Sequence, residues 1–194
     1  MPIENSNISD MDDKELIAIS LKEKENYGYL IQRYEARLLR YIIRLSGVRK
    51  EDAEDILQET FIKVYKNLNE YNANLSFSAW IYRITHNETI SHLRRLKARP
   101  KIAESEDSSL LMDFVKSDPG FGADIENKFL AKDLAEVIDS LDDKYRDVII
   151  LMYLEDKSYK EISDIIKKPV GTVATLISRA KKQLKDKIMK NNHF

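Results

Sequence analysis

The stretch 171–184, GTVATLISRAKKQL, has apolar residues at helical spacing and carries all its positive charge in its second half. On a wheel of 100° per residue, one apolar stripe contains Val170, Val173, Ile177, Ala180, Leu184 and Ile188. The opposite face presents Thr172, Thr175, Ser178, Arg179 and Lys182, with Ala174 and Leu176 on the flanks. Hydroxyl and ammonium groups can hold phosphates, and Arg179 suits a bidentate contact with guanine. This face can bind DNA, with few side chains that read bases.

The residues before this stretch predict a second helix beside it. Ser158 and Glu161 have the S-x-x-E spacing of a capping box, which fixes a helix start. The apolar face of that helix consists of Ile162, Ile165 and Ile166. Pro169 cannot continue it, and a new helix begins near Val170. Two helices across a tight turn, the second ending in cations, are typical of a helix-turn-helix. An αα-hairpin of core helices has the same pattern, so the pattern alone leaves both readings open.

A second candidate surface for nucleic acid is the segment 77–101, which mixes aromatic and cationic residues. Its apolar stripe begins with Phe77, Trp80, Ile81 and Ile84 and shifts beyond His86 to Ile90, Leu93 and Leu96. Its polar side contains Arg83, Asn87, Ser91 and Arg94, followed by Arg95, Lys97, Arg99 and Lys101. Such a stripe is what a surface that follows phosphates requires. In the preceding loop, Tyr71 beside Asn72 and Asn74 suits either a turn or stacking on an unpaired base.

Carboxylates gather in the segment 51–59, as Glu51, Asp52, Glu54, Asp55 and Glu59. Acids in a first helical turn interact favourably with the helix dipole, which is the simplest explanation. Acid–base or metal chemistry is disfavoured because no His or further ligand lies in the segment, and the spacing of His86 and His92 does not suit a metal. We therefore expect no catalytic residue, metal or cofactor. A face for a protein of complementary charge remains open.

The net charge of −1 on 194 residues hides strong segregation. Residues 83–101 contain six cations and one acid, residues 102–127 one cation and seven acids, and residues 167–190 eight cations and one acid. Two basic blocks around an acidic one indicate patches that bind polyanions. The lack of cysteine excludes disulfides and suits a reducing cytoplasm. No apolar run approaches the ~20 residues of a membrane span, and we expect no signal peptide and no membrane insertion.

Helical periodicity dominates the chain, and no alternating strand pattern is evident. We expect helices over about 51–68, from near 76 to before Pro100, and over 125–140, with three shorter helices beyond; Gly47 supplies a stop for an earlier helix. The fold class is therefore all-α, with two helical domains. We predict domains at 10–98 and 127–190, joined by an acidic, flexible linker over 99–126.

The order of these features closely resembles the bacterial sigma-70 family of RNA polymerase sigma factors. Region 2 of that family is matched by D-A-E-D-I-x-Q-E-T-F at 52–61, by F-S-A-W-I-Y-R-I at 77–84, and by Asn87 and L-R-R at 93–95. Region 4 is matched by L-D-D-K-Y-R-D-V at 141–148, S-Y-K-E-I at 158–162, P-V-G-T-V at 169–173 and S-R-A-K at 178–181. With only these two regions, the chain is similar to the extracytoplasmic-function (ECF) group.

The resemblance implies roles for particular residues. Core polymerase would be bound at its β′ clamp and β flap, with the clamp contacts made by Asp52, Asp55, Gln58, Glu59 and Phe61. The −10 element of promoter DNA would be bound by Tyr71, Asn72, Arg83, Asn87, Arg94 and Arg95. The −35 element would be bound by Thr172, Thr175, Ser178, Arg179, Lys181 and Lys182. The resemblance further implies a cytoplasmic, non-enzymatic initiation factor, held inactive by an anti-sigma protein.

Two departures from the family pattern concern its DNA contacts. Ser91 stands where the family usually has Asp, and Ala174 and Leu176 stand where it usually has cations. We therefore expect thin readout of the −35 element, or an unusual target. A free-standing regulator with a sensing or dimerising N-terminal module is the main alternative. The acidic segment 51–59 and the aromatic-basic segment 77–101 count against it, since a sensor domain has no need of both.

Overall fold

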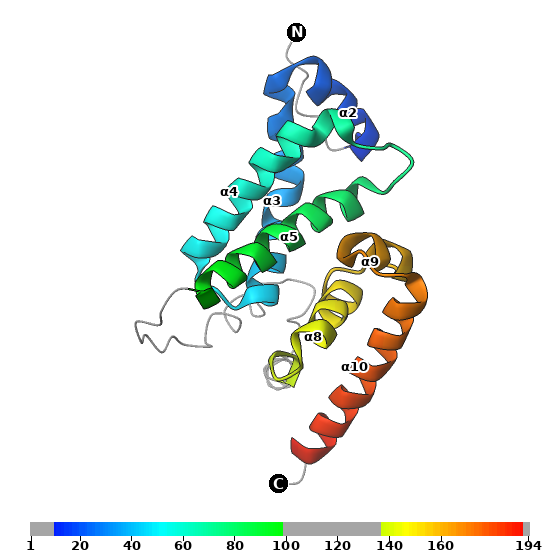
Figure 1. The fold of residues 1–194 in the computed structure, drawn as a ribbon. Helices are drawn as coiled ribbons and strands as arrows, with labels where there is room; N and C mark the ends of the chain where they lie inside the picture. Colours follow the sequence, from blue (N-terminus) through cyan, green and yellow to red (C-terminus); the bar gives the residue numbers. More distant parts are fainter. Residues whose placement is uncertain (1–9, 99–136, 192–194) are drawn as a thin grey trace.

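The computed structural model describes residues 10–98 and 137–191, and within these ranges it contains helices and no strand (Figure 1). The N-terminal part consists of α2 (Asp13–Lys22), η1 (Lys24–Asn26), α3 (Tyr27–Ser46), α4 (Lys50–Asn67), η2 (Leu68–Glu70) and α5 (Phe77–Ala98). The C-terminal part contains α8 (Asp143–Ile149), η3 (Ile150–Leu154), α9 (Tyr159–Ile166) and α10 (Val170–Asn191). The all-α prediction is confirmed. The predicted linker over 99–126, and most of the helix expected over 125–140, lie outside the described residues.

Three helices, α3, α4 and α5, pack on one another and form the body of the N-terminal part (Figure 1). Their facing sides are buried because each helix repeats apolar residues every three or four positions. The innermost side chains include Leu38, Tyr41, Ile42, Val64 and Ile81. As predicted, α3 ends at Gly47, whose positive φ of 64° lets its N–H bond to the carbonyl oxygen of Ile43 at 2.8 Å.

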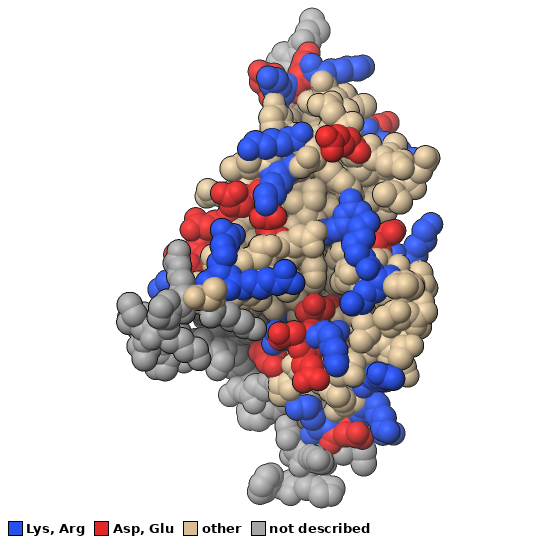
Figure 2. Space-filling model, viewed as in Figure 1, with Lys and Arg blue, Asp and Glu red and all other residues tan. Residues whose placement is uncertain are grey.

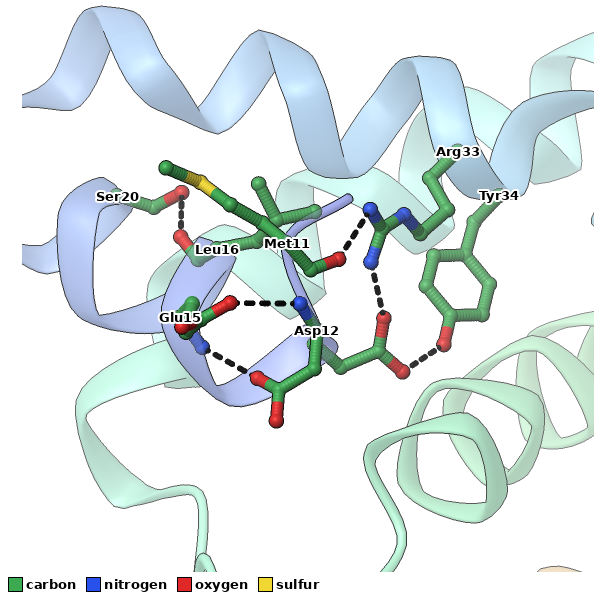
Figure 3. A network of polar contacts seen from close by, with 8 residues as sticks. Met11, Asp12, Glu15, Leu16, Ser20, Arg33 and Tyr34 are labelled. Carbon is green, nitrogen blue, oxygen red and sulfur yellow. Dashed lines mark hydrogen bonds and ion pairs between the residues drawn. The ribbon is translucent and has the colours of Figure 1, made fainter. Parts of the chain in front are cut away.

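Helix α2 is tied to α3 by a polar network (Figure 3). The capping box of Asp12 and Glu15 fixes the start of α2. From α3, Arg33 bonds to the Asp13 carboxylate at 3.1 Å and donates to the Met11 carbonyl at 2.7 Å, and the Tyr34 hydroxyl donates to the other Asp13 oxygen. Because these donors converge on one short segment, they set the angle at which α2 crosses the bundle.

The C-terminal part is built around α10, which packs against α8 and α9. The capping box predicted for α9 is present, with the Ser158 hydroxyl accepting from the Glu161 N–H. Between α8 and α9 the chain widens into a π-helix, η3, after which the Glu155 N–H bonds to the carbonyl oxygen of Ile150 at 3.1 Å. One expectation was wrong: α10 is not a short helix but has 22 residues, as many as α5.

The N- and C-terminal parts share a single apolar core, in which α9 packs against α5 (Figure 1). The N-terminal part contributes Phe77, Trp80 and Ile81 from α5, among others. The C-terminal part contributes Ile149, Leu151, Ile162 and Ile165, among others. The sequence predicts two domains and contains no sign of this contact.

Candidate nucleic-acid interface

Helix α10 presents a polar face because its other face is packed. Val173, Ile177 and Ala180 are fully buried, and Leu184 is half-buried. Val170, predicted to belong to the same stripe, is 45% exposed, which corrects the helical-wheel assignment. It is the first residue of α10 and lies at the end of the stripe, where its side chain is open to solvent. The two flanking residues, Ala174 and Leu176, are half-buried, as expected.

The outward side of α10 is exposed at every position predicted to bind DNA. These exposed residues are Thr172, Thr175, Ser178, Arg179, Lys181 and Lys182. The Thr175 hydroxyl donates to the carbonyl of Gly171 at 2.9 Å, so only its lone pairs remain for a ligand. The Lys181 ammonium lies 5.5 Å from the centre of the Tyr153 ring, which draws this cation towards η3. The remaining hydroxyls, Arg179 and Lys182 are exposed together, and groups of this kind are able to bind phosphates, with a guanidinium also suited to a base edge.

The turn before α10 holds the helix at a fixed angle to α9. Lys167 ends α9 in the left-handed region, at a φ of 54°. The Ser163 hydroxyl donates to the Lys168 carbonyl at 2.6 Å, and the Lys168 N–H returns a bond to the Ser163 carbonyl at 3.3 Å. The Pro169 carbonyl then accepts from the N–H groups of Thr172 and Val173. A rigid turn of this kind is what a helix-turn-helix needs to position its second helix.

A polar stripe also follows α5, on the side turned away from the core. Arg83 is half-buried, and Asn87, Arg94 and Arg95 are exposed. The Arg95 side chain donates to the carbonyl of Ser91 at 3.4 Å, so it lies along the helix. Of the four predicted −10 residues of this helix, Arg83, Asn87 and Arg94 therefore lie within about 40° of one another, and Arg95 lies at the edge of the stripe.

The loop before α5 is ordered by its own side chains. The Tyr71 hydroxyl donates to the Leu75 carbonyl, and its ring lies 5.3 Å from those of Phe77 and Trp80. The Asn72 side chain accepts from the Asn74 N–H at 3.0 Å. Burial raises the pKa of Tyr71. Tyr71 thus closes the loop, while Asn72 and Asn74 are exposed at its tip.

His86 is part of the packing of α5 against α3. Its Nδ1 lies 3.0 Å from the hydroxyl oxygen of Tyr41, a fully buried residue. Burial lowers the pKa of His86 to about 4, so the ring is neutral at pH 7. With the ring proton on Nε2, the Tyr41 hydroxyl donates to Nδ1. Across the described ranges, no group of three or more His, Asp or Glu residues is placed to hold a metal ion.

Helix α4 carries an exposed acidic face (Figure 2). Asp55, Gln58 and Glu59 are exposed there, and Asp52 is half-buried with an ion pair to Arg49 at 3.5 Å. Phe61 is only 8% exposed, so it supports this face from within the core and does not form part of it. In Figure 2, Asp and Glu side chains lie along the outer edge of α4, while Lys and Arg lie towards the C-terminal end of α10.

Sequence reasoning missed two apolar residues on this face of α4. Ile62 is 47% exposed and Tyr65 is 39% exposed, at the spacing that continues the row of Asp55 and Gln58. A helical wheel could have found them, since Ile62 and Tyr65 lie about 160° and 140° from the buried Thr60. The Tyr65 ring also packs edge-on against Tyr27, with 5.0 Å between the ring centres, so its exposed edge and Ile62 are the apolar area that this face offers to a partner.

Two family models match the chain in the parts just described. Residues 30–99 match sigma-70 region 2, and residues 131–184 match sigma-70 region 4. The protein described as ECF RNA polymerase sigma factor SigW of Bacillus subtilis is 30% identical over 183 residues, covering 90% of this chain and 95% of the relative. The ECF RNA polymerase sigma-E factor of Escherichia coli is 30% identical over 177 residues, covering 86% and 88%.

Solved structures share the fold. One, of CnrH in complex with the cytosolic domain of CnrY, has a TM-score of 0.66 at 21% identity and covers 93% of this chain and 98% of the solved chain. Another, of the sigma factor RpoE in complex with the anti-sigma factor NepR from Bartonella quintana, has a TM-score of 0.65 at 20% identity and covers 85% and 98%. The chain is thus a transcription initiation factor by class. It belongs to the sigma-70 family of RNA polymerase sigma factors, in the ECF group.

One further observation concerns membranes. In the described parts of the chain, no helix combines the length and apolarity that crossing a bilayer demands.

Proposed function

We infer that this chain binds core RNA polymerase and directs it to promoters, without catalysing a reaction itself. The observation that carries this proposal is the exposed face of α10, where hydroxyls, a guanidinium and an ammonium group lie opposite a fully buried stripe. Such a helix can enter a major groove without unpacking its domain. The −35 contacts are assigned to this face, and readout is thin because Arg179 is its main base reader.

The −10 contacts are assigned to the loop before α5 and to the exposed side of that helix. Asn72 and Asn74 offer amides at the loop tip, and Arg94 and Arg95 offer cations for phosphates. Tyr71 acts here by holding the loop in shape, since its hydroxyl and ring already have partners. A base flipped out of the DNA stack would form hydrogen bonds with the side-chain amides of Asn72 and Asn74.

Core polymerase is assigned to the acidic face of α4, through Asp55, Gln58 and Glu59 with Ile62 and Tyr65. Acids at the rim would steer a basic surface of the β′ clamp, and the apolar pair would supply buried area. The C-terminal part would contact the β flap. An inhibitor protein is also proposed, because similar folds are solved with partners named as an anti-sigma factor or as the CnrY cytosolic domain. The site of action is then the cytoplasm.

Co-elution of the purified chain with core polymerase, followed by transcription from a genomic promoter library, tests the proposal. The double variant Asp55→Lys/Glu59→Lys should bind core about tenfold more weakly, because it reverses the rim charge. Glu35→Lys is the control, since it makes the same change at an exposed position on α3. Failure of the wild-type chain to bind core, with no inhibitor protein present, would refute the assignment.

A further inference from the structure

The two parts of the chain are joined by a buried polar contact as well as by the apolar core. Glu155, just after η3, places its Oε1 3.0 Å from the Arg44 guanidinium of α3 and accepts from the Tyr82 hydroxyl of α5 at 2.6 Å. Only 7% of the Arg44 side chain and 5% of the Glu155 side chain are exposed. Both carboxylate oxygens are therefore held by the N-terminal part.

Lys157 adds to the same contact from the next turn of the chain. Its ammonium donates to the Ser78 hydroxyl at 2.8 Å and lies 4.2 Å from the centre of the Tyr82 ring. At the edge, the Ser76 hydroxyl donates to Glu161 at 3.2 Å. We call Arg44, Tyr82, Glu155 and Lys157 the interdomain latch.

The latch specifies one arrangement of the two parts, and the shared apolar core supplies the stability of that arrangement. A buried ion pair adds little net stability over apolar residues, but leaving one of its charges buried without the other is costly. Because each partner comes from a different part of the chain, any other packed arrangement of the two parts would bury these charges without their partners. The latch therefore specifies a closed position.

In the closed position, the −10 and −35 surfaces lie too close together to contact both promoter elements at once. The Ser76–Glu161 contact lies two residues from Asn74 and, through α9 and its turn, eleven residues from Thr172. From the rise of a helix and of extended chain, Asn74 and Thr172 are at most about 45 Å apart. The −10 and −35 elements lie about 25 base pairs apart, or ~85 Å of B-form DNA.

We propose that the interdomain latch is an autoinhibitory contact, which holds the free chain closed and must open before both promoter elements are read. The proposal rests on the proposed function for its consequence, but the closed state itself is a property of the chain alone. Opening exposes α9 and the start of α5 and lets the α10 face move away from the −10 loop. The inhibition then needs no second protein, and an inhibitor would act by binding a state that already exists.

The full chain allows a direct test because it contains no cysteine. Gln32→Cys on α3 and Asp186→Cys on α10, both exposed, carry spin labels for a distance measurement. The otherwise wild-type chain should give one narrow distribution. Glu155→Arg, which faces Arg44 with a like charge, should give a broad and longer distribution, and Glu155→Gln an intermediate one. Glu35→Arg is the matched control and should leave the distribution narrow.

Within the described residues, the side-chain hydrogen bonds of Glu155 go to Arg44 and Tyr82 of the N-terminal part and to no residue of its own part. Misfolding is a separate outcome, and an unchanged helical circular dichroism spectrum excludes it for each variant. A broad distribution in the otherwise wild-type chain, or a narrow one in Glu155→Arg, would overturn the latch.

A second measurement separates the latch from the proposed function. Glu155→Arg should bind core polymerase at least about tenfold more tightly than wild type. The reason is that the apparent affinity is proportional to the fraction of molecules that are open. Opening without any gain in affinity would overturn the autoinhibition. If neither chain binds core, the inhibition fails together with the proposed function, while the spin-label distances still decide whether the latch closes the chain.

Discussion

The buried position of His86 predicts a specific dependence of stability on pH. The ordinary pKa of 6.5 falls to about 4 in the folded chain because burial disfavours the charged ring. A group whose folded pKa is depressed contributes stability above its unfolded pKa and loses it as pH falls. Stability should therefore decline as pH falls from about 6.5 to 4.

The size of this effect follows from proton linkage. With pKa values of 6.5 unfolded and about 4 folded, the free energy of unfolding falls by about 2 kcal/mol between pH 7 and pH 5. The variant His86→Gln removes the titration and keeps an acceptor for the Tyr41 hydroxyl. Compared with this variant, the wild type should lose about 2 kcal/mol over the same interval.

Urea unfolding followed by tryptophan fluorescence measures the difference. Trp80 is the one tryptophan of the chain and is buried on the same helix as His86, so it reports the relevant part. At an m-value of about 2 kcal/mol per molar urea, the midpoint difference between the two chains should change by about 1 M. Asn87→Gln, a change at the exposed neighbouring position, is the control. A midpoint difference that is the same at both pH values would refute the burial argument.

Three further predictions concern single side chains of the C-terminal part. Arg179→Ala should relax base preference within the −35 element. Lys182→Ala should instead weaken binding equally for all sequences and reduce the slope of log affinity against log salt concentration by about 1. Equal losses across a promoter panel for both variants would show that Arg179 does not read a base. Burial raises the pKa of Asp147 from 3.8 to about 7, so its contribution to stability is largest at low pH and is lost as pH rises through 7. Asp147→Asn should abolish a decline of about 2 kcal/mol between pH 5 and pH 7, measured by urea unfolding with circular dichroism, and an unchanged pH profile would contradict this. Ser158→Ala should cost about 1 kcal/mol by removing the capping box of α9. Lys160→Ala, at an exposed position of the same helix outside that box, is the comparison in thermal unfolding.

Local patterns were sufficient to predict most of the helices and the exposed face of α10. Capping at Ser158, the stop at Gly47 and the repeat of Val173, Ile177 and Ala180 depend on residues within a few positions of one another. The error at Val170 has a simple cause. A helical wheel assumes that the apolar stripe is covered along the whole helix, and the stripe is open to solvent at the first residue of α10.

The contact between the two parts could not be predicted in the same way. Arg44 and Glu155 are 111 residues apart, and each alone reads as an ordinary charge in a polar sequence. Phe61 shows the complementary difficulty, since a motif match says that a position belongs to a functional segment but not which way its side chain points. The assignments of single residues to polymerase and DNA stay predictions.

The π-helix η3 has a consequence for how insertions and deletions act in this protein. A π-helical turn accommodates one residue more than an α-helical turn, so η3 sets the rotational phase of everything that follows it. Deleting one residue within 150–154 and restoring α-helical winding would keep Glu155 in phase, because the deletion removes the extra residue. Rewinding η3 as an α-helix with all five residues kept would instead rotate Glu155 by roughly 100° about the helix axis. The carboxylate would then no longer face Arg44 and Tyr82, although every side chain of the latch would still be present. The phase of a single turn is thus as much a determinant of the closed state as the charges themselves.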